Sequence, residues 1–390
     1  MFADKPGEFA YPRELLLRLI LMSVFDGGLS SREIERKTRT DIAYMYLAGM
    51  QHPSYRTIAR FKVDYPDLID ESFKTTIKIA KEEDLVKIHH VSLDGTKIKA
   101  KTSMNKLTNE QQLKIMKQHL KESIELDEEE DMELGEESGK DIISINDPDA
   151  RFMKNKKWKW EFDYNGQIAV DDYKGIILAS YITDNSTDYY ELIPLMEQVQ
   201  SNLSEIYDET PVNYQVSADN GYSTDMNTEY LEQNGFDGYI SSRKLSREQK
   251  KYNLSDKPFA KDNFFYDNEM MTYICPLGQP LYKISEYTYK NKSRISHWTK
   301  ECKTYPMQLF CSKGNRCRVI QDYGIPSKIR MQWKMETPEA KERYKIRSKT
   351  VERPFAHLKQ NMHLTEFRTT GLQEVNTELK LYTIGHNLKR

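Results

Sequence analysis

The sequence has no hydrophobic run long enough to cross a membrane. Its longest apolar stretch, from Leu15 to Phe25, is interrupted by Arg18, whereas a membrane-spanning helix needs about 20 apolar residues. No small-residue cleavage site follows this stretch, so it does not predict a signal peptide. With 38% hydrophobic and 30% charged residues among 390, the composition is typical of a soluble globular chain of two or three domains and excludes fibrous and disordered classes. We expect a cytoplasmic protein.

Cysteine is also scarce. The chain has four, Cys275, Cys302, Cys311 and Cys317, separated by 26, 8 and 5 residues, and none of them forms a CxxC pair. That pair is the spacing by which many structural zinc sites are identified. Free thiols are therefore the simpler interpretation, with a structural zinc site as the alternative.

The formal net charge of −2 conceals an uneven distribution. Residues 122 to 141 contain eleven acidic residues and one lysine, a local charge of −10, which leaves about +8 on the rest of the chain. A body of that sign suits a polyanionic partner, because neutralising phosphates releases condensed counterions. The signal favours nucleic acid modestly, since many proteins indifferent to DNA have such a balance.

Residues 11 to 87 have the pattern of short helices joined by tight turns. Apolar residues recur at helical spacing up to Val24, and Ser30 with Glu33 has the spacing of a capping box that opens a second helix. A third helix is expected from about Asp41 to Met50, and a fourth after Ser54. The basic residues expected to be exposed here are Arg32, Arg36, Lys37, Arg39, Arg56, Arg60 and Lys62. A helix-turn-helix-like DNA reader and a plain helical bundle with a solvated basic face fit this pattern equally well.

The pattern changes to strands after His89. Residues 91 to 98 alternate apolar and polar, residues 167 to 170 and 175 to 182 predict neighbouring strands, and residues 214 to 218 predict a further strand that runs into Asp219. A helix is expected between the strand at 175 to 182 and the strand at 214 to 218. Asp188 and Glu191 are expected to cap it, and its apolar stripe consists of Leu192, Leu195, Met196 and Val199. Strands in a meander followed by alternating strands and helices describe a mixed α/β sheet flanked by helices.

The expected domain division follows from these changes of pattern. Residues 1–87 form a helical N-terminal domain, and residues 88–244 form the first part of an α/β core with an acidic insert at 107–147 whose composition also suits a disordered segment. Residues 245–335, rich in Tyr, Lys and Asn, look like an inserted module of short strands and loops. Residues 336–390 are helical, with a break around Gly371.

Three acidic residues occupy positions that suit a metal site. Asp94 interrupts a strand pattern where a charge is costly, and Asp219 ends an apolar strand, the place where α/β sheets present ligands. Glu352 lies in a helix between Val351 and Phe355, so we expect it to point toward the core. Mg²⁺ and Mn²⁺ prefer hard oxygen ligands, and paired ions of this kind clamp the attacking and leaving oxygens of a phosphodiester.

The local sequences around these acids resemble the DDE transposases of bacterial insertion sequences over nearly the whole chain. The similarity covers Leu93 to Ala100 around the first aspartate, Tyr164 to Asp171, Ala218 to Ser223 around the second aspartate, and Val351 to Phe355 with Lys359 around the glutamate. Residues 30–35, 47–49 and 56–61 are similar to the family's N-terminal domain. The resemblance implies an RNase H-like catalytic fold.

The resemblance also implies roles for individual residues. Asp94, Asp219 and Glu352 would hold two divalent cations, Mg²⁺ or Mn²⁺, and Lys359 and Arg347 would contact DNA phosphates, with an ordinary helix-surface pairing as the alternative for these two. The remaining expected DNA-binding residues are Arg32, Arg36, Arg56, Arg60, Lys62 and Lys97. The expected partner is double-stranded DNA, both element ends and target, bound by a homodimer in the synaptic complex within the bacterial nucleoid.

The implied function is DNA cleavage followed by strand transfer. Two alternatives stay open at this point: a catalytically inactive DNA-binding relative, truncated or domesticated, and a simple metal-dependent nuclease. Intact acids at all three positions favour catalysis over the first alternative, and the basic N-terminal region with the large insertion favours transposition over plain cleavage.

Overall fold

The computed structural model describes residues 11–102, 144, 146–154, 159–207, 213–241, 258–259, 261–267, 269–289, 292–304, 307–312 and 317–390. They fall into two compact units, one formed by Met1–Pro211 with Lys349–Arg390 and the other by Val212–Ser348. Most of the acidic insert expected at 107–147 lies outside the described residues. In the part of the chain that is described, no helix is long and apolar enough to cross a membrane.

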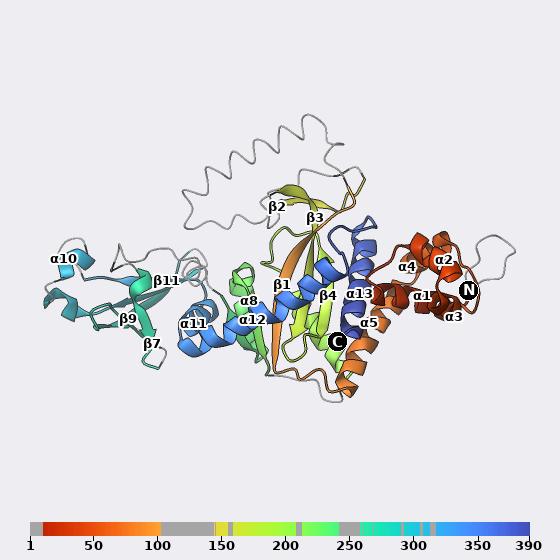
Figure 1. Ribbon diagram of the computed structural model, residues 1–390. Helices are drawn as coiled ribbons and strands as arrows, with labels where there is room; N and C mark the ends of the chain where they lie inside the picture. Colours follow the sequence, from red (N-terminus) through yellow and green to blue (C-terminus); the bar gives the residue numbers. More distant parts are fainter. Residues whose placement is uncertain are drawn as a thin grey trace. The chain divides into compact units, whose positions relative to one another are not determined.

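Five helices open the first unit: α1 (Arg13–Phe25), α2 (Ser31–Thr40), α3 (Ile42–Leu47), α4 (Tyr55–Asp64) and α5 (Pro66–Glu82) (Figure 1). The predicted capping box is confirmed, because the Ser30 side chain accepts from the Glu33 backbone N–H while Glu33 accepts from that of Ser30. The side chains of Asp41 and Ser54 cap α3 and α4 by accepting from the Ala43 and Thr57 N–H groups. These caps satisfy backbone N–H groups that a helix start leaves unpaired.

An antiparallel group of strands follows. β1 (His90–Lys99) pairs with β3 (Trp160–Asp171), and the other edge of β3 pairs with β2 (Arg151–Lys154) and with β4 (Ile177–Thr183). The predicted strands around residues 91–98, 167–170 and 175–182 are therefore confirmed, whereas β2 was not predicted. β3 also begins seven residues earlier than its apolar run, because Trp160 and Phe162 pair with β2.

The first unit is completed by helices on its strands. α7 (Leu192–Ser204) buries the predicted stripe of Leu192, Leu195, Met196 and Val199. α13 (Leu372–Leu388) lies against β4 and α5 (Figure 1), and twelve of its seventeen residues are buried. α13 begins after Gly371, whose φ of 92° suits glycine, at the predicted break in the helical region.

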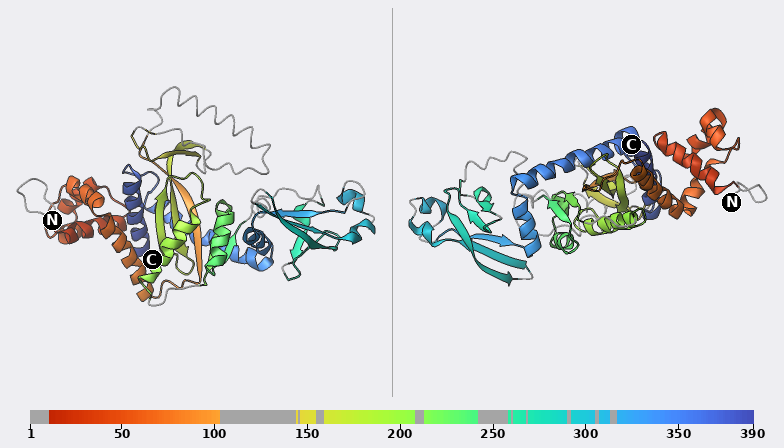
Figure 2. Two further views of the ribbon diagram at one scale, coloured as in Figure 1. Left: turned by 180° about the vertical axis from the view of Figure 1, so that it is seen from behind. Right: turned by 90° about the horizontal axis from the view of Figure 1, so that it is seen from below.

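The second unit contains two groups of strands. β5 (Gln215–Ala218) and β6 (Asp237–Ile240) form a parallel pair connected through η2 (Asn220–Tyr222) and α8 (Asp225–Gln233). A separate five-stranded sheet has the order β11-β10-β9-β8-β7. Its strands are drawn in teal and light blue in Figure 2. Its strands are β7 (Phe265–Asp267), β8 (Thr272–Ile274), β9 (Pro280–Tyr289), β10 (Lys292–Trp298) and β11 (Ile320–Tyr323).

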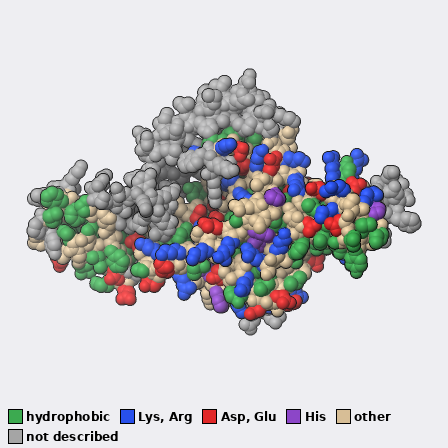
Figure 3. Space-filling model, viewed as in Figure 1, with side chains coloured by type: hydrophobic (Ala, Val, Ile, Leu, Met, Phe, Trp, Pro, Cys, Tyr) green, Lys and Arg blue, Asp and Glu red, His purple; other side chains and the backbone are tan. Residues whose placement is uncertain are grey.

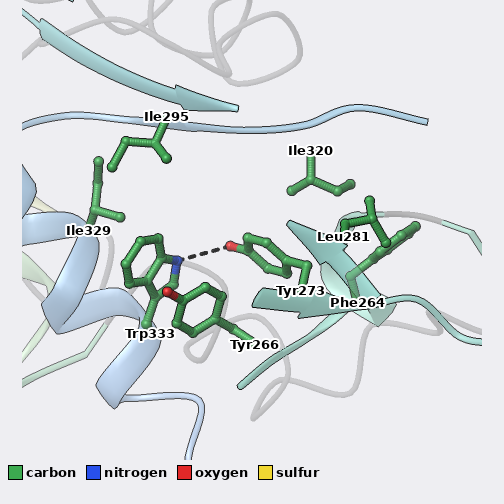
Figure 4. Close-up of a cluster of buried hydrophobic side chains, with 8 residues drawn as sticks. All are labelled: Phe264, Tyr266, Tyr273, Leu281, Ile295, Ile320, Ile329 and Trp333. Atoms are coloured by element: carbon green, nitrogen blue, oxygen red, sulfur yellow. Dashed lines mark hydrogen bonds between the residues drawn. The ribbon is translucent and has the colours of Figure 1, made fainter. Parts of the chain in front are cut away.

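Short helices surround the five-stranded sheet: η4 (Lys261–Asn263), η5 (Lys300–Thr304), α10 (Gln308–Cys311) and α11 (Pro326–Lys334). Its core is an aromatic cluster in which Tyr266 stacks on Trp333 at 3.9 Å between ring centroids, and the Trp333 indole N–H donates to the Tyr273 hydroxyl (Figure 4). The helix α12 (Pro338–Ala356) then continues along the chain into η6 (His357–Asn361), a π-helical turn. The described fold is thus mixed α/β, as predicted.

Candidate functional site

Asp94 lies in the middle of β1 on a strand whose neighbours are buried. Its side chain is 9% exposed, and Ser92, Thr96 and Ile98, which share its face of the strand, are buried as well. Opposite Asp94 on β3 is Ile168. A carboxylate in such surroundings is costly unless charged or polar groups compensate for it, so this position is unusual for a purely structural residue.

Lys359 reaches the face of β1 that carries Asp94. Its ammonium donates to the Thr96 hydroxyl at 2.7 Å and to the Lys97 carbonyl at 2.9 Å. Lys359 belongs to the π-helical η6, in which the Met362 N–H donates to the His357 carbonyl, five residues back. Turns of this kind occur often at functional sites because they redirect side chains.

The chain beyond η6 is hydrogen-bonded to the end of β1. The Lys99 N–H donates to the Thr365 carbonyl at 3.3 Å, and the Phe367 N–H donates to the Lys99 carbonyl at 2.9 Å. Together with the Lys359 contacts, these bonds attach the segment that follows Glu352 directly to the strand that carries Asp94.

Glu352 does not point toward the core as predicted. Its side chain is exposed, while Val351, Pro354, Phe355 and Leu358 are buried. Those four positions have the spacing of one helical face, and Glu352 lies about 100° around the helix from Val351. The prediction that Val351 and Phe355 lie on the buried face of the helix was therefore correct. The prediction that Glu352, between them, points to the same side was wrong.

Asp219 lies in the second unit, directly after β5. One oxygen of its carboxylate accepts from the Gly221 N–H at 2.8 Å and so caps η2. The other oxygen lies 3.8 Å from the guanidinium of Arg347, whose side chain is only 12% exposed, against 40% for Asp219. Arg347 therefore compensates the charge of Asp219 in this unit, an arrangement that the sequence did not predict.

The opposite face of β1 carries a polar network. Gly95 and Lys97 lie on this face, next to Gln167 and Asn165 on β3. The side-chain amides of Gln167 and Asn165 donate to one oxygen of Asp188 at 2.7 and 2.8 Å. A Cβ atom on Gly95 would lie 2.5 Å from that same oxygen and 2.5 Å from the Gln167 nitrogen, so this position has no room for a side chain.

Lys97 and Asp163 belong to the same region and have shifted pKa values. Burial lowers the pKa of Lys97 to about 8, and Asp188, Asp163 and Glu191 counteract that shift. Burial likewise raises the pKa of Asp163 to about 6. The Lys97 ammonium donates to the Ser186 carbonyl at 2.6 Å. A DNA contact by Lys97, which the sequence suggested, would require the side chain to leave this internal position.

Asp188 and Glu191 do not cap α7 with their side chains, contrary to the prediction. The Glu191 carboxylate instead accepts from the Tyr181 hydroxyl at 2.5 Å, the Asn185 amide at 2.6 Å and the Thr183 hydroxyl at 3.2 Å. Both acids are thus used by partners on the strands, which local sequence near the helix start cannot reveal.

The N-terminal helices present a basic surface around Tyr55. The Arg32 and Arg56 guanidinium groups lie 5.0 and 5.8 Å from the centroid of the Tyr55 ring, and the Tyr55 N–H donates to the Glu35 carboxylate, which joins α4 to α2. Arg32, Arg36, Arg56 and Arg60 are all exposed, as predicted. Figure 3 shows lysine and arginine side chains gathered over α2 and α4.

Two of the basic residues expected to be exposed here are not. Lys37 is held between Asp26 and Asp41 at 3.0 and 3.1 Å. Lys62 is half-buried, and burial lowers its pKa to about 8 although Glu378 of α13 counteracts the shift. The partners of Lys62 come from the far end of the chain, so the helical pattern alone could not predict them.

A second basic surface lies along α12, where Figure 3 shows a row of lysine and arginine side chains. Lys345, Lys349 and Arg353 are exposed and four residues apart, so they form one ridge along the helix. Glu352 immediately precedes the last of them. This ridge was not predicted, although the four-residue spacing of its three basic residues is present in the sequence.

Among the described residues, no three His, Cys, Asp or Glu side chains stand close enough together to hold a metal ion. Asp94 and Glu352 belong to the first unit and Asp219 to the second. Chemically the three fit such ions, because all are carboxylates, the ligand type that hard divalent cations prefer.

Comparisons with known proteins agree with these observations at the family level. One family model, described as "Transposase DDE domain", matches residues 274–390, and another, described as "Transposase domain (DUF772)", matches residues 1–64. Comparison with curated proteins gives no match.

Among solved structures, a piggyBac transposase in a synaptic complex with hairpin DNA is similar at 10% sequence identity, with a TM-score of 0.38 over 99% of this chain and 68% of that one. The two family matches, to a DDE transposase domain near the C-terminus and to a transposase domain near the N-terminus, confirm the resemblance to DDE transposases of the insertion-sequence type that was seen in the sequence.

Proposed function

We propose that this chain is a transposase that cuts DNA at the ends of an insertion sequence and joins the freed 3′-OH to target DNA, with Asp94, Asp219 and Glu352 as its catalytic carboxylates in an RNase H-like core. Mg²⁺ or Mn²⁺ bound to such a set supplies Lewis-acid stabilisation for the attacking and the leaving oxygen of the phosphodiester. The proposal requires the three side chains to meet at the ions.

The observation that carries the proposal is the contact of Lys359 with β1. Lys359 lies seven residues, two helical turns, after Glu352, and its ammonium rests on the face of β1 that carries Asp94. The same contact gives Lys359 a role: an ammonium on the strand face that carries a proposed catalytic carboxylate is suited to hold a DNA phosphate there.

The exposed basic residues supply further contacts with the phosphate backbone. The ridge of Lys345, Lys349 and Arg353 adjoins Glu352, and we assign to it the DNA close to the cut. Arg32, Arg36, Arg56 and Arg60 would hold the element end, with Tyr55 fixing two of the four guanidinium groups. Arg347 is largely buried beside Asp219, so we assign it first to positioning that carboxylate. Cutting two ends calls for two sites, and therefore for a homodimer.

The test is cleavage of a DNA fragment that carries the element end, in Mg²⁺ and in Mn²⁺. We expect Asp94→Asn, Asp219→Asn and Glu352→Gln to abolish cleavage while each variant still binds the fragment in a gel-shift assay with EDTA. Glu339→Gln is the matched control, because Glu339 is an exposed acid in the first turn of the same helix as Glu352.

The outcomes separate the proposal from its alternatives. Cleavage by all three variants at the wild-type rate would reject the carboxylate assignment. Specific binding by the wild type without cleavage in either metal would favour a DNA-binding protein without catalysis. Cleavage without any joined product would indicate a nuclease.

A further inference from the structure

Three of the four cysteines line one cavity in the second unit, and the fourth directly precedes another residue of its lining. Cys275 follows β8, Cys302 lies in η5, Cys311 ends α10, and Cys317 precedes β11. Cys275, Cys302 and Cys311 line a cavity of about 30 Å³, and so does Arg318, the residue after Cys317. All four thiols are free and partly buried. Residues separated by up to 41 positions in the chain thus converge at one place.

The thiols are also close enough to influence one another. Burial raises the pKa of the Cys302 thiol, and Cys317, Cys275 and Cys311 raise it further. Burial raises the pKa of Cys311 as well, with Arg318 acting against the shift and Cys275 adding to it.

The backbone at Cys275 has hydrogen bonds suited to a thiolate. The Gln279 N–H donates to the Cys275 sulfur at 3.3 Å, and the Cys275 N–H donates to the Gln279 carbonyl at 2.8 Å. Gly278 makes this tight turn possible, with a φ of 81°. A backbone donor aimed at a sulfur fixes its direction, as the groups around metal ligands commonly do.

Arg318 provides a second, independent indication of an anion. Its Nε–H group is buried and has no hydrogen-bond partner among the described residues. A buried guanidinium N–H without an acceptor is costly. Thiolate sulfurs carrying the negative charge of a metal–cysteine cluster would supply that acceptor and a compensating charge.

We propose that Cys275, Cys302, Cys311 and Cys317 bind one structural Zn²⁺ ion. Four S–H protons pass to solvent as four Zn–S bonds form, leaving a cluster of net charge −2 beside Arg318; no oxidant is needed. The described side chains do not already stand at metal-binding positions, so binding includes rotation of the cysteine side chains into the cavity. This inference goes beyond the proposed catalytic function, since the zinc would have no part in DNA cleavage.

The location explains what the ion would stabilise. Cys275 and Cys311 pack against the aromatic core of the five-stranded sheet. η5 and α10 are only five and four residues long and contribute little regular structure of their own. Zinc would join these short elements to the sheet, as metal ions do in small modules with limited cores.

The experiment measures zinc in the untagged full-length chain, purified with a phosphine reductant and dialysed against metal-free buffer. We expect about one zinc per chain, and a cobalt-substituted protein with the visible absorption of tetrahedral Co²⁺ and a thiolate-to-cobalt charge-transfer band. The double variant Cys302→Ser, Cys317→Ser should lose both. Leu277→Ala, which changes the lining of the same cavity without removing a ligand, should keep both.

Two further measurements protect the test against misfolding of the double variant. In the wild type, titration with p-hydroxymercuribenzoate should release the zinc in step with modification of the four thiols. Arg318→Gln should bind zinc about tenfold more weakly or worse in competition with a chelator, as removal of groups that support metal ligands usually does. Zinc far below one per chain, zinc retained by the double variant, or disulfides among these cysteines in the fresh protein would each overturn the proposal.

Discussion

A pair of histidines, one of them fully buried, predicts how acid acts on the first unit. His386 of α13 is fully buried, with its Nε2 2.9 Å from the Gly175 carbonyl and its Nδ1 3.0 Å from Nδ1 of His357. The Arg390 Nε also lies 3.4 Å from Nε2 of His386, but the shorter contact of Nε2 is with a carbonyl, which only accepts, so Nε2 of His386 carries the proton and its Nδ1 is an acceptor. His357 must then donate from its own Nδ1. This pairing holds only while the His386 ring is neutral, because its protonation would remove the Nδ1 lone pair that accepts.

The pKa of His386 follows from this environment. The pKa of His386 is lowered to about 3, and burial is the largest cause. The hydrogen bond to the Gly175 carbonyl acts in the opposite direction, and the charges of Arg390 and His357 add to the lowering. An unfolded histidine titrates near pH 6.5. Between the two values the unfolded state binds more protons than the folded state, so stability is lost as the pH falls below about 6.5. From pH 7.5 to 5.5 the loss amounts to about 1.4 kcal/mol.

The comparison that isolates this effect is wild type against His386→Gln. A glutamine amide can donate to the Gly175 carbonyl and accept from His357, but it does not titrate. Hydrogen–deuterium exchange reports on α13 directly when each rate is divided by the intrinsic rate at the same pH. We expect the protection of α13 amides to fall about tenfold more in the wild type than in the variant between pH 7.5 and 5.5.

Other groups that titrate in this range do not disturb the comparison. Burial raises the pKa values of Asp163 and Asp171 to about 6, and their contribution has the opposite sign, since a raised carboxyl pKa makes the folded state bind protons more readily. Both residues are present in both proteins and cancel. Equal pH dependence in wild type and variant would refute the assignment of a neutral His386.

Three further predictions rest on individual contacts. Gly95→Ala should lower the free energy of unfolding by about 1–3 kcal/mol, because its Cβ would lie 2.5 Å from polar atoms of Asp188 and Gln167; urea unfolding measures this, and an unchanged midpoint would contradict it. Ser30→Ala should cost about 1 kcal/mol through loss of the α2 cap, visible in the same assay. Arg56→Ala should weaken binding to the element end and reduce the salt slope of log K by about 1; an unaltered slope would remove Arg56 from the DNA surface.

The sequence predicted best where structure depends on neighbours in the chain. The Ser30 capping box, the strand around Asp94 and the apolar stripe of α7 all follow from spacings of two to four residues. The resemblance to DDE transposases was also predictable, because the motifs that carry it are short continuous segments of the sequence. Family matches at both ends of the chain bear this out.

Predictions failed where a distant partner decides. Asp188 and Glu191 have the composition of helix caps, but amides and hydroxyls on β3 and β4 bind their carboxylates instead. Lys62 has the position of a surface residue, yet its ammonium faces Glu378, more than 300 residues later. The ion pair of Arg347 with Asp219 likewise joins positions 128 residues apart. No local pattern encodes these pairings.

Polar contacts on both faces of β1 hold Asp94 in position. Successive residues of a strand point to opposite faces, so the Asp94 face and the Gly95 face move as one. Lys359 holds the first through Thr96, and the amides of β3 with Asp188 occupy the space beside the second. Directional polar contacts on both faces restrict sliding and rotation of the strand more than apolar packing alone would, because hydrogen bonds weaken steeply with misalignment. Gly95 is what permits the second set of contacts, since any side chain there would displace the carboxylate that receives the β3 amides.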